Sequence, residues 1–140
     1  MGSFSDYLEA KLLDHVFGKT NAYTAPTTLY LALFTVTPSD SGGGTEASGG
    51  GYSRLAITNN TTNFPNATGS SPTTKTNGAD FAFPAANADV SSGSNMVAWG
   101  LFDASSNGNL IAWGALSGAK PWLNLDTFTI PSGLMSITLD

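Results

Sequence analysis

Cysteine is absent from this sequence, which excludes a disulfide framework, a thiolate zinc site and a cysteine nucleophile. Charge is also sparse: only 11% of residues are charged, whereas about a quarter is typical of soluble domains. Five basic residues stand against ten acidic ones, giving a net charge of −5. Because nucleic-acid binding needs a basic footprint, we expect no nucleic-acid partner.

Long apolar runs and targeting signals are missing as well. No stretch reaches the length of a transmembrane helix, so we expect no membrane partner. Residues 1–19 have neither the basic start nor the apolar core of a secretory signal. Asp6 stands where a myristoylation signal has Ser or Thr.

The polar positions are filled mainly by Ser, Thr, Asn and Gly. The 140 residues are enough for one domain, here residues 1–140, and 41% of them are hydrophobic. A chain of this length can bury a core without disulfide or metal cross-links. A surface poor in charge is typical of a protein that meets other protein chains, because interface cores are depleted of charge. A β-rich extracellular or viral protein explains the same composition equally well.

Residues 27–37, TTLYLALFTVT, carry the strongest strand signal. Pro26 and Pro38 bracket the run, and its length and terminal threonines favour a strand over a helix. Side chains alternate between the two faces of a strand. One face holds Leu29, Leu31 and Leu33, and the other holds Tyr30, Ala32, Phe34 and Val36. Because both faces are apolar, we expect a central strand covered on both sides.

Two similar segments, NMVAWGLFD at 95–103 and NLIAWGAL at 109–116, predict a β-hairpin. Asn107-Gly108 lies between them and tolerates positive φ. Simple alternation places Val97, Trp99 and Leu101 on one face of the first strand and Ile111, Trp113 and Ala115 together on the second. Gly100 and Gly114 follow the two tryptophans and are expected to permit close approach of a neighbour. We interpret the tryptophans as packing residues; a sugar-binding platform that includes Trp122 is the alternative.

Shorter strands are expected on either side of this hairpin, at 52–58, 61–64, 80–83, 125–130 and 134–139. The last two are predicted to pair as a second hairpin around a Pro-Ser-Gly turn. Long polar loops are expected at 38–51 and 59–79. The pattern predicts an all-β protein, an antiparallel β-sandwich or jelly-roll-like domain of seven to eight strands over residues 27–140, with one N-terminal α-helix.

The helix is predicted at residues 4–17, within a segment 3–18, from apolar residues at helical spacing. Two roles remain open for it: it covers the second face of the central strand, or it docks on a neighbouring chain. In the second case its apolar residues and the uncovered strand face form an interface. The interface candidates are Phe4, Tyr7, Leu8, Leu12, Tyr30, Phe34 and Val36.

Motifs for catalysis or metal binding are not recognisable. His15 is the only histidine, and no G-x-S-x-G nucleophile elbow is present. The glycines at 41–51 lack the Lys that follows a phosphate-binding loop. Asp40 and Glu46 flank these glycines without the alternating acids of a calcium loop. We therefore expect no catalytic residue, metal or cofactor, and hence no enzyme.

Five stretches of the chain carry a family resemblance. They are FSDYLEAKLLDHVFG at 4–18, TAPTTLYLALFTVTPSDSGGGTE at 24–46, GGGYSRLAIT at 49–58, WGLFDASSNGNLIAWGAL at 99–116 and IPSGLMSITLD at 130–140. In these stretches the chain resembles a family of small virion structural proteins of tailed bacteriophages. The resemblance supplies no catalytic residues.

The resemblance implies a location in the virion and partners among virion proteins. Within that class we expect a capsid decoration or cement protein on the outer surface of the head, bound to the major capsid protein through many repeated contacts. A tail or tail-fibre component is the alternative, followed by a host-glycan-binding module. A homo-oligomer is expected, with a trimer favoured on a quasi-symmetric shell.

Overall fold

One large mixed sheet and a small second sheet make up most of the fold in the computed structural model, which describes residues 2–18 and 21–139. The predicted all-β class with one α-helix is confirmed. The elements are β1 (Gly2–Phe4), α1 (Asp6–Val16), β2 (Thr28–Val36), β3 (Thr45–Glu46), β4 (Leu55–Thr58), β5 (Thr73–Thr76), β6 (Phe81–Ala82), a 3-10 turn (Val90–Gly93), β7 (Asn95–Phe102), β8 (Leu110–Pro121), β9 (Thr129–Ile130) and β10 (Ser136–Leu139).

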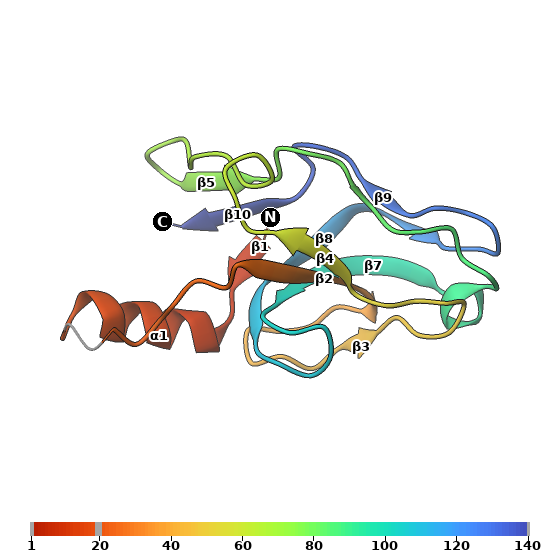
Figure 1. The fold of residues 1–140 in the computed structure, drawn as a ribbon, viewed down its shortest axis with the longest axis horizontal. Coiled ribbons are helices and arrows are strands. Elements are labelled where there is room, and N and C mark those ends of the chain that lie inside the picture. The colour runs from red at the N-terminus through yellow and green to blue at the C-terminus, as the bar shows by residue number, and fades with distance from the viewer. Residues whose placement is uncertain (1, 19–20, 140) are drawn as a thin grey trace.

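The large sheet has the strand order β3-β2-β7-β8-β1-β10-β5, and β4 also pairs with β2 (Figure 1). All its pairs are antiparallel except β1 with β10, which is parallel. The second sheet pairs β6 with β9. Aromatic residues on and beside these two short strands join the leucines of β2 in one main core: Phe81, Phe83, Trp122 and Phe128.

Strand β2 is buried on both faces along most of its length, as its sequence predicted. Leu31 and Leu33 belong to the main core. Ala32 and Phe34 form a second, outer cluster on the opposite face. The apolar face ends at Val36, which is 56% exposed.

Helix α1 does not cover this outer face of β2. Phe102 stacks on Phe34, with ring centroids 6.3 Å apart, and the Arg54 guanidinium lies 3.6 Å from the centre of the Phe102 ring. Helix α1 instead places Leu8 in the main core. Of the two roles left open for the helix, covering the Phe34 face is thus not the one that the structure shows, because residues from β7 and the segment before β4 occupy that face.

Strands β7 and β8 form the predicted hairpin, with positive φ at Asn107 and Gly108. The expected facing holds for Trp99 with Leu101 and for Trp113 with Ala115, but it is wrong for Val97 and Ile111, because the pairing is interrupted by bulges between Met96 and Ala98 and between Leu101 and Phe102. A bulge inserts one residue and reverses the alternation beyond it. The first bulge therefore turns Val97 to the outer cluster, away from the face of Trp99.

The two tryptophans of the hairpin point to opposite faces. Trp99 pairs with Gly114, and Trp113 pairs with Gly100; residues directly opposite in antiparallel strands share a face. A Cβ on Gly114 would lie 2.6 Å from Cζ2 of Trp99. A Cβ on Gly100 would lie 2.9 Å from Cε2 of Phe34, in the outer cluster. Both glycines thus allow the close approach expected of them, on different faces.

The predicted C-terminal hairpin does not form. Strand β9 pairs with β6, and β10 pairs with β1 and β5. Buried Asn77 lies at the turn between them: its side chain donates to the Pro131 carbonyl and accepts from the Met135 amide, both at 2.9 Å. A side-chain amide thus bonds the backbone on both sides of the turn, and beyond it each strand pairs with a different partner.

Three other local predictions need correction. The segment 59–79, expected as one long polar loop, contains β5, which pairs with β10. The helix begins at Asp6, and residues 2–4 form β1, inserted between β8 and β10. Ser5 causes the change, because its Oγ caps the helix by accepting from the Leu8 amide at 3.3 Å. The strand expected at 61–64 is a turn, in which Asn60 Oδ1 accepts from the amides of Thr62 and Asn63.

Candidate interaction surface

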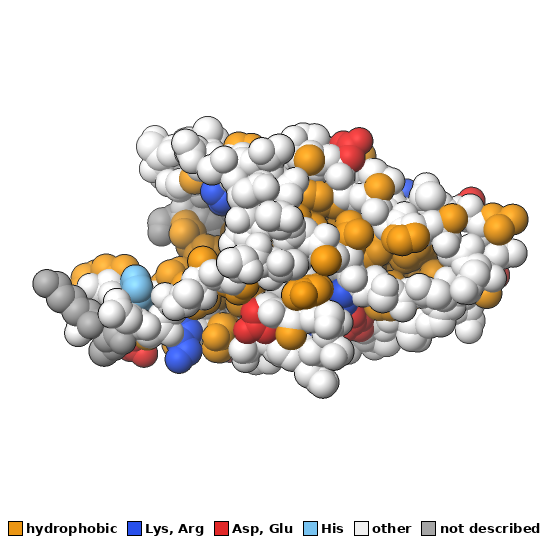
Figure 2. Space-filling view, viewed as in Figure 1, with side chains coloured by type: hydrophobic (Ala, Val, Ile, Leu, Met, Phe, Trp, Pro, Cys, Tyr) orange, Lys and Arg blue, Asp and Glu red, His pale blue; other side chains and the backbone are white. Residues whose placement is uncertain are grey.

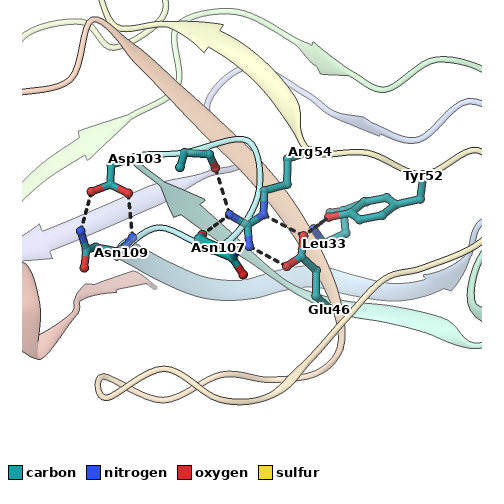
Figure 3. Close-up of polar contacts among 8 residues, drawn as sticks. Leu33, Glu46, Tyr52, Arg54, Asp103, Asn107 and Asn109 are labelled. Carbon is teal, nitrogen blue, oxygen red and sulfur yellow. Dashed lines mark hydrogen bonds and ion pairs between the residues drawn. The ribbon is translucent and has the colours of Figure 1, made fainter.

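Arg54 holds two loops together at one end of the large sheet (Figure 3). Its Nε and Nη2 donate to Oε1 and Oε2 of Glu46, each at 2.8 Å. Its Nη1 donates to the carbonyls of Ala104 at 3.0 Å and Asn107 at 2.8 Å. We call this arrangement the Arg54 clasp. It fastens the 38–51 loop, which contains Glu46 on β3, to the β7–β8 turn.

Tyr52 extends the clasp toward the core. Its hydroxyl donates to Glu46 Oε1 at 2.8 Å and accepts from the Leu33 amide at 3.3 Å. The Tyr52 ring also lies edge-on to Trp122, at a centroid distance of 6.3 Å. The loop carboxylate is thereby tied to the central strand β2.

The β7–β8 turn has its own internal brace. The Asp103 carboxylate accepts from the backbone amide and from Nδ2 of Asn109, both at 2.7 Å. These two bonds close the turn whose carbonyls receive Arg54 (Figure 3). The polar side chains at this end therefore hold loops in fixed positions, which is a structural role.

The clasp shifts the pKa values of its members. Burial by itself raises the pKa of Glu46, but hydrogen bonds from Arg54 and Tyr52 and the Arg54 charge outweigh burial, so the pKa lies below its ordinary value of 4.5. Burial, followed by the neighbouring Glu46 carboxylate, raises the pKa of Tyr52. Glu46 is thus held ionised and Tyr52 neutral.

The lowered Glu46 pKa makes the clasp sensitive to acid. A carboxyl whose pKa is lower in the folded state contributes stability above its unfolded value, and this contribution is lost as pH falls through the folded value. We expect Glu46→Gln to be less stable than the wild type at pH 7 and the difference to shrink below about pH 4.5. Urea unfolding of both proteins between pH 7 and pH 3 measures this, and a constant difference would contradict it.

Most of the predicted interface residues pack against other residues of their own chain. Leu8 and Phe34 are buried. Three more, Phe4, Tyr7 and Leu12, are partly buried against the main core. Tyr30 is partly exposed on β2. Of the seven, Val36 is the clearly exposed apolar side chain, so the set does not form one surface patch.

The exposed apolar residues of α1 lie beside the predicted ones. Leu13, Val16 and Phe17 are 60%, 63% and 75% exposed. Their spacing of three and four residues places them on one side of the helix. These three residues belong to the apolar pattern that predicted the helix. The pattern did not distinguish the side of the helix that buries Leu8 from the side that exposes these residues.

The sugar-binding platform is not assembled by the three tryptophans. Trp99 and Trp122 lie in the main core. Trp113 is partly exposed, and its Nε1 donates to Asp40 Oδ1 at 2.9 Å. Of the two acids beside the glycine-rich loop, Asp40 therefore binds an indole and Glu46 pairs with Arg54. Within residues 2–18 and 21–139, no helix has the length and apolar content needed to cross a lipid bilayer.

The described residues thus form a β-rich scaffold whose polar groups tie its loops together. The family model described as Podophage GP4 fiber I protein gp80 matches residues 3–138, which is nearly the whole chain. The chain belongs to this family. The resemblance to tailed-phage virion structural proteins is thereby confirmed. No curated protein matches the chain.

Proposed function

We propose that this protein is a non-enzymatic structural component of a tail fibre in a tailed phage. The family match over residues 3–138 carries the proposal, since the family is described by a podophage fibre protein. This favours the tail-fibre alternative over the capsid decoration role expected first. The partners are then other fibre and tail proteins, and the chain acts as a homo-oligomer.

The fold supports this role. A fibre part must hold its shape while its ends are loaded, and the Arg54 clasp fixes two loops on the sheet through charge-assisted hydrogen bonds. Low surface charge also suits a chain whose surface is largely in contact with other protein.

Copy number distinguishes the two virion roles. Quantitative mass spectrometry of purified particles is expected to find a few copies per virion, in a multiple of three or six. Immunogold labelling with antibodies against the protein is expected to mark the tail. Hundreds of copies, with label over the head, would replace the fibre proposal with capsid decoration.

A further inference from the structure

The outer end of α1 presents an apolar side chain, Phe17, that the described residues of the chain leave mostly exposed. Phe17 caps the helix, is 75% exposed and lies beside Leu13 and Val16 on the same side. Figure 2 shows hydrophobic side chains along the outer part of α1. An exposed cluster of large apolar residues marks a site of interaction with another macromolecule.

A small apolar socket lies at the same end of the molecule. It has a volume of about 120 Å³ and is lined by Phe4, Ala67, Thr73, Lys75, Ile137 and Leu139, from β1, β5, β10 and the loop before β5. Figure 1 places α1 and the ends of β5 and β10 on the same side of the fold, and Figure 2 shows hydrophobic side chains in the hollow between them. We call it the β10 socket.

Phe17 does not fill the β10 socket of its own chain. The start of α1 is tied to the sheet by the Ser5 amide, which donates to the Ile111 carbonyl at 3.0 Å, and by Leu8 in the main core. With its start anchored, the helix carries Phe17 outward, where it is mostly exposed. The chain therefore has a projecting aromatic residue and an apolar socket that do not meet.

Charge supports a second copy as the occupant. Lys75 lines the β10 socket. Phe17 directly follows the C-terminal end of α1, where the helix dipole is negative. An α1 end that inserts Phe17 into the β10 socket brings its carbonyl groups toward a cation. The projecting part and the receiving part are thus complementary in both apolar character and charge.

We propose that Phe17 of one copy inserts into the β10 socket of a second copy. The contact is heterologous, with different surfaces on the two partners, and it closes into a ring if the rotation between copies permits. The proposal adds the contact between copies to the proposed function. It is tested on the isolated protein, so its outcome is separate from the location of the protein in the virion.

Light scattering coupled to size-exclusion chromatography of the full chain tests the contact. The wild type is expected to elute above the monomer mass. Phe17→Ser removes the projecting ring and Ala67→Phe fills the β10 socket, so each variant is expected to weaken self-association by about tenfold or more. Leu125→Ser is the matched control, because Leu125 is 78% exposed but lies outside both surfaces.

Mixing the two variants tests the direction of the contact. Phe17→Ser keeps an open β10 socket and Ala67→Phe keeps the projecting ring, so a mixture is expected to form a one-to-one dimer that neither variant forms alone. Because the chain has no cysteine, Phe17→Cys and Ala67→Cys chains can also be mixed and oxidised, and a covalent dimer is expected. Circular dichroism confirms that each variant is folded.

Three results would overturn the proposal. One is a wild type that stays monomeric at high micromolar concentration. The second is a Phe17→Ser variant that assembles as well as Leu125→Ser. The third is an Ala67→Phe variant that, when folded, assembles as well as the wild type, since the β10 socket then has no part in the contact.

Discussion

Replacing Trp99 with alanine is expected to lower the free energy of unfolding by about 4 kcal/mol. The side chain is 1% exposed and lies in the main core. Two glycines leave room for it: a Cβ on Gly2 would lie 2.8 Å from its Cη2, and one on Gly114 2.6 Å from its Cζ2. The surrounding backbone of β1 and β8 cannot collapse into the space, so a cavity remains. Urea unfolding monitored by far-ultraviolet circular dichroism measures the loss.

Trp113→Ala is the matched control for this substitution. Trp113 pairs with Gly100, the neighbour of Trp99, on the other strand of the hairpin. It is partly exposed, and its indole donates to Asp40. The alanine variant loses this bond and only partly buried apolar surface, so its loss is expected to be about 2 kcal/mol, half that of Trp99→Ala. Equal losses for the two variants would contradict the opposite facing of the tryptophans.

Arg54→Met is expected to cost about 3 kcal/mol, because it leaves the partly buried Glu46 carboxylate without its cation. The Arg54 side chain is 7% exposed, and it gives up both bonds to Glu46, both loop carbonyl bonds and the contact with the Phe102 ring. The methionine keeps much of the length and apolar volume of the side chain. Urea unfolding at pH 7 measures the loss, and increased proteolysis in the 38–51 loop is expected to accompany it.

Two further variants separate the clasp from a general effect of charge. Lys120→Met removes an exposed cation whose Nζ lies 4.3 Å from the Phe128 ring centre, and it is expected to cost less than about 1 kcal/mol. Arg54→Lys keeps the charge but loses the two-pronged geometry, so an intermediate loss is expected. If Arg54→Met costs no more than Lys120→Met, the clasp does not stabilise the fold.

The parts of the fold that were predictable have strong local signals. Strand β2 was recognised because both its faces are apolar between two prolines, and the β7–β8 hairpin because Asn107-Gly108 suits a turn with positive φ. The C-terminal segment had a similar turn signal and did not form a hairpin, since β9 pairs with β6 and β10 pairs with β1 and β5, all far away in sequence. Local pattern identifies a turn but not the partner of each strand.

The candidate surfaces were less predictable for the same reason. The Arg54 clasp joins β3, the segment before β4 and the β7–β8 turn, and no sequence spacing links these three segments. The helical period identified α1, but it did not tell Leu8, which is buried, from Phe17, which projects. That distinction depends on Ser5 and β1, which set the angle at which the helix leaves the sheet.

The sequence by itself determined the all-β class, the doubly buried β2, the β7–β8 hairpin and the resemblance to virion structural proteins, because each rests on residues close together in the chain. Tertiary structure alone decided which tryptophan is buried, since the bulge between Leu101 and Phe102 sets the register in which the two tryptophans face opposite sides. It also decided that Phe4, Ala67 and Ile137 meet in one socket. Such contacts depend on how strands that are far apart in the sequence pair with one another. The hydrophobic period of a single segment does not contain that information.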